Sequence, residues 1–272
     1  MEEYRIGQLY ATTVESRNKT DGDSAVQIFE NRPFEDHQVY GSGQYTHKRM
    51  HFGSKLPSFL DYILPASYKV VDEKSFNTFP TCHTGTLTIM LLINLAEYIH
   101  EKFPTSKMVV RTVHVEDDDG RRANVFNLPP ERLSQRQVVH LDLALDGITP
   151  DKPKHRNPQL VKSEKTHRGP LRRGWVKSLK GEGHPVMCAY KLIDCTFDSY
   201  LLWAASGSFA GYVKDLMLDF NQYVYCLMDQ WYGLTIEDIR SIEAEFRDEA
   251  DRIVKYAGIE EREKTPSSTK SA

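Results

Sequence analysis

The sequence predicts an α+β domain, and three features of its patterning support that class. Runs with the alternation of strands occupy much of the first two thirds of the chain. The opening segment and the C-terminal third instead repeat apolar residues at the spacing of a helix. We therefore expect strands wrapped around one long helix in a single domain over residues 1–258. A disordered polar tail is expected over residues 259–272.

The first expected element is an amphipathic helix. Its apolar residues Ile6, Leu9, Tyr10 and Val14 recur at helical spacing, and we expect it to end near Asn18. Strand-like runs follow, rich in β-branched and aromatic residues. Strands are expected over Ala25–Glu30, Gln44–Phe52, Met108–Val115, Val138–Leu145 and Val186–Phe197.

Two connections between these strands carry local signals. Pro57 stands at a helix start and Pro65 stops it, which predicts a short helix between them. The run Asp117–Gly120 predicts the turn between the third and fourth expected strands. It fails as a calcium loop because Val115 occupies the first ligand position.

The C-terminal third predicts two helices. A long apolar stripe runs from Phe209 to Trp231, and Gly233 is expected to break it. Thr235 with Asp238 resembles a capping box at the start of the second helix. That helix carries the apolar stripe Ile239, Ile242, Phe246 and Ile253, and is expected to end by Gly258.

Composition is that of an ordinary globular protein. The 272 residues carry a net charge of −3, which excludes a polyelectrolyte binder as a whole. The longest apolar stretch, about residues 87–96, is too short to span a bilayer. The four cysteines form no CxxC pair and read as free thiols of a reducing compartment. The start has neither a basic region nor an apolar core, so we expect a cytoplasmic protein.

The segment Gly43–Lys48, which reads Gly-Gln-Tyr-Thr-His-Lys, contains the first functional signal. In a strand, alternate side chains share a face, so this face would carry Gln44, Thr46, Lys48, Met50 and Phe52. A lysine on a buried face is costly unless an anionic group meets it. The face is either a solvent face with two apolar residues or the lining of a cavity that binds a phosphate and a hydroxyl-bearing headgroup.

Glu243 is the second signal. It lies within the apolar stripe of the last helix, between Ile239 and Phe246. One interpretation is a carboxylate at the edge of the stripe that reaches water. The other is a functional group, either an acceptor for sugar hydroxyls or a partner for Lys48.

The chain resembles the phosphatidylinositol transfer proteins across about residues 3–256. The resemblance rests on an ordered set of motifs, of which no single one would suffice. The motifs are Glu3–Tyr10, Gly43–Lys48, Phe76–Thr84, Arg168–Leu171 with Trp175, Met187–Leu192 and Leu234–Arg240. The family implies a START-like helix-grip fold, in which a curved, mostly antiparallel sheet around a long helix encloses a lipid cavity.

The resemblance also implies site residues. The headgroup of phosphatidylinositol would be bound by Thr46, Lys48, Asn77 and Glu243, with Thr84 and Gln8 as further members. A lysine suits the phosphodiester or an inositol hydroxyl, and hydroxyl, amide and carboxylate groups suit the inositol ring. Cys82 would be the pocket thiol and Phe220 a pocket aromatic. Each is equally an ordinary core residue on its sequence alone.

Membrane docking and regulation are implied for two further segments. The family places a tryptophan pair where this chain has Ser199-Tyr200, so docking would fall to Tyr200, Leu201, Leu202 and Trp203. These side chains could instead pack under the following helix. Residues 151–180 hold ten Lys and Arg against two acidic residues, which favours a regulatory loop that also contacts anionic membrane. Ser163, within it, matches the family's phosphorylatable serine.

These readings predict a non-enzymatic carrier that exchanges one phosphatidylinositol or phosphatidylcholine molecule between membranes. The alternative is a module that presents or senses the lipid for phosphoinositide kinases without net transport. We expect no cofactor, no metal and no nucleic acid, since Trp175 alone interleaves the basic segment as an aromatic. The expected partners are the phospholipid, a transient membrane surface and lipid kinases, and the expected state is a monomer. The sequence leaves open the role of the apolar insertion at residues 85–96 and the lack of the family's first strand.

Overall fold

The computed structural model describes residues 1–20, 24–38, 41–52, 70–78, 81–88, 107–196 and 206–257. Its chain divides into two compact units, and we describe each on its own. The first unit comprises Met1–Thr12, Thr112–Lys191 and Ala210–Arg240, and the second comprises Thr13–Arg111, Leu192–Phe209 and Ser241–Ala272. The expectation of a single domain over residues 1–258 stays a prediction.

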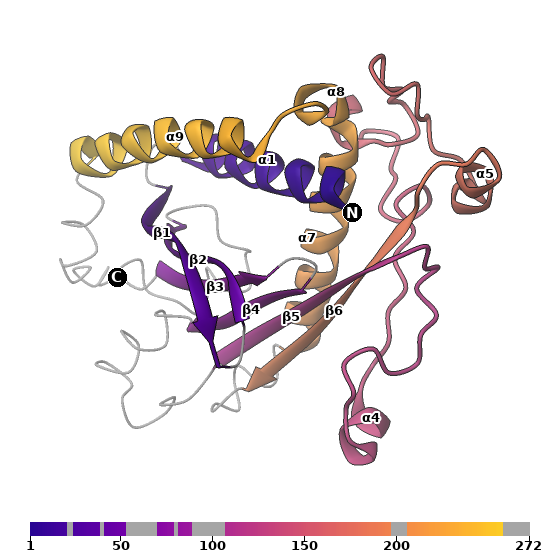
Figure 1. Cartoon of the computed structure of the whole chain (residues 1–272), viewed down its shortest axis with the longest axis horizontal. Helices are drawn as coiled ribbons and strands as arrows, with labels where there is room; N and C mark the ends of the chain where they lie inside the picture. The colour runs from indigo at the N-terminus through magenta and orange to yellow at the C-terminus, as the bar shows by residue number, and fades with distance from the viewer. Residues whose placement is uncertain are drawn as a thin grey trace, which may run out of the picture. The chain divides into compact units, whose positions relative to one another are not determined.

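An antiparallel sheet forms the body of the second unit. Neighbouring strands pair in chain order: β1 (Ala25–His37), β2 (Gly41–His51), β3 (Val70–Thr78) and β4 (Thr81–Thr88). β5 (Lys107–Glu116) and β6 (Met187–Thr196) continue the sheet within the described residues (Figure 1). β1, β2, β5 and β6 confirm four expected strands. β3 and β4 were not expected, and residues 85–88 of the apolar insertion extend β4.

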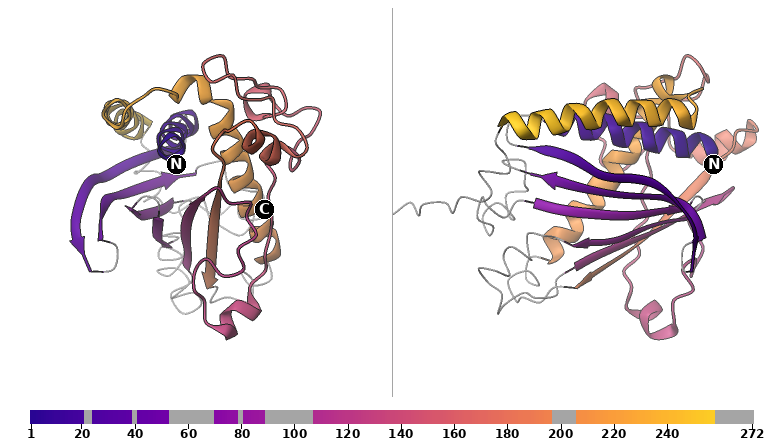
Figure 2. Two further views of the ribbon diagram at one scale, coloured as in Figure 1. Left: turned by 45° about the vertical axis from the view of Figure 1, so that its right-hand side comes forward. Right: turned by 60° about the vertical axis from the view of Figure 1, so that its left-hand side comes forward.

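β1 contains an irregularity that matters for the site. Ile28 pairs with Lys48 but Glu30 pairs with His47, so Phe29 is an extra residue in the ladder. Such a bulge reverses the alternation of faces beyond it. Asn31 therefore lies on the same face as Val26 and Ile28, although its odd number would otherwise place it on the opposite face. β1 and β2 also bend along their length (Figure 2).

α9 (Ile236–Ala257) covers one face of β1 in the second unit. Val26 and Ile28 form a buried cluster with Phe246 and Ala250, and Met50 of β2 packs against it. We call this the covered face of the sheet. α9 lies beside the end of α1 (Glu2–Lys19), where Arg17 and Glu249 form an ion pair at 2.8 Å (Figures 1 and 2). α1 and α9 confirm two expected helices.

The first unit is built around α7 (Ser206–Cys226). The expected break at Gly233 is confirmed, since Gly233 has a positive φ between the end of α8 (Met228–Trp231) and the start of α9. The sequence did not predict an earlier interruption, at which α7 ends at Cys226 before α8 begins. The turn is held by Trp231, whose Nε1 donates to the Val224 carbonyl at 2.8 Å. Gly7 of α1 packs against the same indole, and a Cβ there would lie 2.8 Å from it.

Both local signals at the ends of these elements are confirmed. The Thr235 amide donates to Asp238 Oδ2 at 2.8 Å, and the Asp238 amide donates to Thr235 Oγ1 at 3.2 Å, which closes the capping box before α9. The turn after β5 is also present, with positive φ at Asp117 and Gly120. It leads into a long connection to β6 rather than into another strand.

The expected strand Val138–Leu145 is wrong. This segment is irregular and then turns at Asp142, whose carbonyl accepts from the amides of Leu145 and Asp146. Val138 and Val139 are more than half exposed, so no neighbouring strand covers them. The connection instead contains three short helical elements that the sequence did not predict. These are α4 (Pro130–Gln135), η2 (Lys154–Arg156) and α5 (Trp175–Gly181). The expected helix at residues 57–65 and the polar tail lie outside the described residues.

Candidate functional site

The register of the sheet places most of the expected headgroup residues on one face. Directly opposite residues of paired strands share a face. The pairs are Gln44–Asn77, Thr46–Ser75 and Lys48–Glu73 between β2 and β3, and Asn77–Cys82 and Ser75–Thr84 between β3 and β4. The predicted shared face of β2 is thereby confirmed as far as Met50, whereas Phe52 lies beyond the end of the strand.

This polar row lies on the covered face. Met50 lies opposite Val26, and Lys48 lies opposite Ile28, both of which pack against α9. Thr46 is 8% exposed and Ser75 is 3% exposed. The solvent-face alternative for this segment is therefore wrong for β2, and polar groups share a buried face with the apolar cluster.

Glu243 of α9 reaches this face through a chain of hydrogen bonds. Its Oε2 accepts from Asn31 Nδ2 at 2.8 Å. The Asn31 Oδ1 accepts in turn from Gln44 Nε2 at 2.6 Å. The stripe-edge Glu243 is thus bonded to the sheet. Its pairing with Lys48, the other possibility, is not among the ion pairs between described residues.

Lys48 faces a carboxylate that the sequence reading missed. Glu73 lies directly opposite it on β3, and Ser75 Oγ donates to Glu73 Oε1 at 2.8 Å. Cross-strand neighbours of opposite charge stabilise a sheet modestly. Within the described residues, however, Lys48 is found in no ion pair, so its ammonium is not bound to Glu73 in this structure.

Asn77 and Gly43 bring β2 and β3 unusually close. The Asn77 Nδ2 lies 3.5 Å from the Gln44 carbonyl oxygen. A Cβ on Gly43 would lie 2.4 Å from the Asn77 carbonyl oxygen and 2.9 Å from Thr78 Cγ2. Only glycine fits at this position, which gives the Gly-Gln-Tyr-Thr-His-Lys segment a structural reason for its first residue.

The remaining expected site residues are placed less completely. Cys82 and Thr84 are on β4 at backbone level, and their side chains lie outside the described residues, as does the docking segment Tyr200, Leu201, Leu202 and Trp203. Gln8 of α1 and Phe220 of α7 are half-buried in the first unit. Their membership of a site with residues of the second unit stays a prediction.

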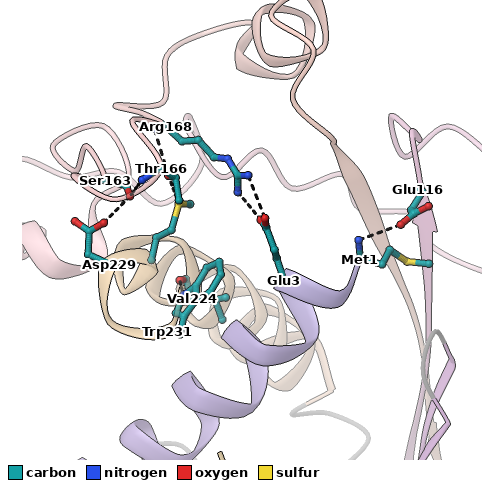
Figure 3. Close-up of polar contacts among 10 residues, drawn as sticks. Met1, Glu3, Glu116, Ser163, Thr166, Arg168, Val224, Asp229 and Trp231 are labelled. Atoms are coloured by element: carbon teal, nitrogen blue, oxygen red, sulfur yellow. Dashed lines mark hydrogen bonds and ion pairs between the residues drawn. The ribbon is translucent and has the colours of Figure 1, made fainter. Parts of the chain in front are cut away.

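Ser163 lies at the centre of a network in the first unit (Figure 3). It is 2% exposed, and its hydroxyl donates to Asp229 Oδ1 at 2.5 Å and accepts from the Thr166 amide at 2.9 Å. The Asp229 carboxylate also accepts from the amides of Glu164 and Lys165. These bonds, the one from Ser163 above all, hold the pKa of Asp229 below its usual value. A kinase could reach this hydroxyl only after the network opens.

Other parts of the basic segment are also held by ion pairs rather than simply solvated. Arg168 Nη1 lies 2.6 Å from Glu3 of α1, and this hydrogen bond raises the pKa of the guanidinium (Figure 3). Lys152 and Arg156 both contact Asp219 of α7, at 3.0 Å and 2.6 Å. Lys165, Arg172 and Lys180 also make contacts within the chain, so at least six of the ten cations serve structural contacts. The membrane-facing role of this segment stays a prediction.

Metal chemistry and membrane spanning find no support in the part of the chain that the structure describes. No group of three His, Cys, Asp or Glu side chains there is arranged to hold a metal ion. None of the described helices is long and apolar enough to cross a bilayer.

Burial raises the pKa of Cys188 to about 11 and of Cys226 to about 12, so these thiols are poor nucleophiles.

Comparison with known proteins identifies the family. A family model described as phosphatidylinositol transfer protein matches residues 1–248. The chain belongs to the phosphatidylinositol transfer protein family. It is 34% identical over 245 residues to cytoplasmic phosphatidylinositol transfer protein 1 of Drosophila melanogaster, covering 89% of this chain and 83% of the relative. It is 33% identical over 266 residues to the human phosphatidylinositol transfer protein beta isoform, covering 95% and 92%.

A longer relative shares only part of its length with this chain. Human membrane-associated phosphatidylinositol transfer protein 2 is 36% identical over 252 residues, which cover 90% of this chain but 17% of that protein. The family membership confirms the resemblance read from the ordered motifs. Asn31 and Glu73 were missed by that reading, and both are found only through strand register.

Proposed function

We propose that this protein is a non-enzymatic carrier that binds one phosphatidylinositol or phosphatidylcholine molecule in a closed cavity and exchanges it between membranes. The observation that carries the proposal is the row of polar side chains on the covered face of the sheet. A folded chain does not bury Thr46 and Ser75, with Lys48 and Glu73 partly buried beside them, next to an apolar cluster without cost. A headgroup that binds to these groups, with acyl chains against the apolar surface, offsets that cost.

The chemistry of the row suits an inositol phospholipid. Lys48 offers a compact cation to an inositol hydroxyl, while Thr46 and Asn77 can donate and accept. The Glu243 carboxylate can accept from ring hydroxyls. Choline presents no hydroxyl, so these residues distinguish phosphatidylinositol from phosphatidylcholine. The curved antiparallel sheet and α7 support the START-like helix-grip fold as the finer description of the architecture.

Exchange between membranes requires that the bound and bilayer states have similar free energies. Burying each CH₂ group of an acyl chain contributes about 0.8 kcal/mol in the cavity as in the bilayer. Replacement of one lipid by another is then nearly balanced, and opening of the covering elements controls the rate. We place the protein in the cytoplasm with transient membrane association, since its relatives carry the names cytoplasmic and membrane-associated.

The test combines ligand detection with transfer. Native mass spectrometry of the purified protein is expected to show one copurified phospholipid. Labelled phosphatidylinositol and phosphatidylcholine are then moved between protein-free vesicles by the wild type, Lys48→Ala, Thr46→Val and Glu243→Ala. The variants are expected to lose phosphatidylinositol transfer by about tenfold or more, the effect of a lost bond to a charged group, and to keep phosphatidylcholine transfer.

Each other outcome has a distinct meaning. If the variants move both lipids as the wild type does, the carrier stands but the headgroup site is wrong. If the wild type binds lipid but moves none, the lipid-presenting alternative replaces the carrier. A wild type that neither holds nor moves phospholipid overturns the proposal.

A further inference from the structure

We infer that Asn31 is a positioning residue for headgroup selection, because it orients the Glu243 carboxylate over the covered face. The inference rests on the proposed function, since it assigns Asn31 a role in the same site. Asn31 is not among the residues implied by the motifs, and we do not propose that it contacts the lipid. Its role is argued from two hydrogen bonds and from the bulge that turns its side chain toward α9.

The amide of Asn31 is held in one orientation by its two partners. Gln44 Nε2 donates to its oxygen at 2.6 Å, so its nitrogen faces Glu243 and donates to Oε2 at 2.8 Å. If the Asn31 amide turned by 180°, its nitrogen would face the Gln44 nitrogen and its oxygen would face the Glu243 carboxylate. Both hydrogen bonds would then be lost. Because the carboxylate can only accept, Glu243 fixes which end of Asn31 faces it, and the bond from Gln44 holds the other end in place.

The bond to Glu243 is of the stronger kind. An amide donor to a carboxylate is a charge-assisted hydrogen bond, in a partly buried setting where such bonds are strengthened. A glutamate side chain otherwise has several rotamers, which a binding lipid would have to restrict at an entropic cost. A carboxylate already oriented by Asn31 binds ring hydroxyls without that cost.

The fold places Asn31 where this role is possible. The extra residue at Phe29 shifts the alternation of β1, so that Asn31 lies opposite Thr46 on the covered face. Its neighbour Arg32 lies on the other face, where its guanidinium stacks on Tyr45 at 5.0 Å. Two adjacent residues of one strand thus provide a test residue and a matched control.

The experiment compares lipid selectivity with stability. Asn31→Leu keeps the size of the side chain but removes both bonds, and Gln44→Met removes the donor that holds the Asn31 oxygen. Asn31→Leu is expected to lower phosphatidylinositol transfer by about tenfold, Gln44→Met by less, and both are expected to leave phosphatidylcholine transfer near the wild-type rate. Arg32→Ala should leave the ratio of the two transfer rates unchanged. In a Glu243→Ala background, Asn31→Leu should have no further effect on that ratio.

The outcomes separate this inference from the proposed function. If the wild type transfers lipid and Glu243→Ala loses phosphatidylinositol selectivity, the proposed site stands. An unchanged rate ratio in Asn31→Leu then overturns the inference alone. An equal fall in both lipids together with a lower melting temperature also overturns it, because Asn31 would then serve stability only. If Asn31→Leu causes an additional loss of selectivity in the Glu243→Ala background, Asn31 acts independently of Glu243. That result also overturns the inference.

Discussion

Gly43→Ala is expected to weaken the sheet at a point where the backbones of β2 and β3 leave no room for a Cβ. The added Cβ would lie 2.4 Å from the Asn77 carbonyl oxygen, whereas real Cβ atoms keep at least 3.0 Å. The two backbones must therefore separate by about 0.6 Å at this pair. The clash is with main-chain atoms of a hydrogen-bonded ladder, so no rotation of a side chain can relieve it.

The magnitude follows from the cost of overpacking. Inserting one carbon into a close-packed site typically costs about 1–3 kcal/mol, and a rigid backbone neighbour places Gly43→Ala near the upper end. A loss of about 3 kcal/mol lowers the melting temperature of a domain of this size by roughly 6–12 °C. Because Gln44 and Asn77 flank the contact, phosphatidylinositol transfer should fall as well.

Thermal unfolding followed by circular dichroism measures the effect, with Gly211→Ala as the control. Gly211 has nothing within 4 Å of an added Cβ, and alanine in the interior of α7 is expected to be neutral or stabilising. Equal melting temperatures for Gly43→Ala and the wild type would refute the close approach of β2 and β3.

Two further predictions concern thiols and pH. In a Cys195→Ser background at pH 7.5, Cys188 and Cys226 should react slowly with maleimide, because fewer than about one in a thousand of these thiols is ionised. Peptide mass mapping measures the labelling of each cysteine. Rapid labelling of either one would contradict its burial. The lowered pKa of Asp229 contributes stability that is complete above the ordinary carboxyl value of 3.8 and is lost as pH falls through the lowered pKa. In urea unfolding, the difference in unfolding free energy between the wild type and Asp229→Asn should therefore be constant from pH 7 to 5 and should shrink below pH 4. Glu164→Gln is the control. A difference that is unchanged at pH 3 would count against the network.

The sequence alone predicted the long helices and the outer strands but missed the short helical elements, β3 and β4, and for β3 the reason is physical. Pattern reading expects one apolar face in a strand. The covered face of β3 instead carries Glu73, Ser75 and Asn77, so neither of its faces shows the expected alternation. The polarity that makes this strand a candidate headgroup surface is also what hides it from a periodicity argument.

Two other differences arise from contacts that a single sequence does not contain. Val138 and Val139 have strand propensity, but a strand also requires a partner edge, and both side chains stand exposed. Asn31 was missed because alternation along β1 assigns it to the wrong face unless the bulge at Phe29 is known. Thr46, Lys48 and Asn77 could be proposed as site residues because a motif resemblance implies them without any knowledge of register.

The division of the site between α9 and the sheet has a consequence for the order of events in exchange. Any motion that lifts α9 from β1 breaks the Asn31–Glu243 bond together with the contacts of Phe246. An opened molecule would therefore lack the carboxylate that we propose distinguishes one headgroup from another. It would admit lipids in proportion to their abundance at the membrane surface, and discrimination would be exercised at closure, when a poorly matched lipid leaves Glu243 without a hydroxyl partner. Selectivity would then be a property of the closing step rather than of entry.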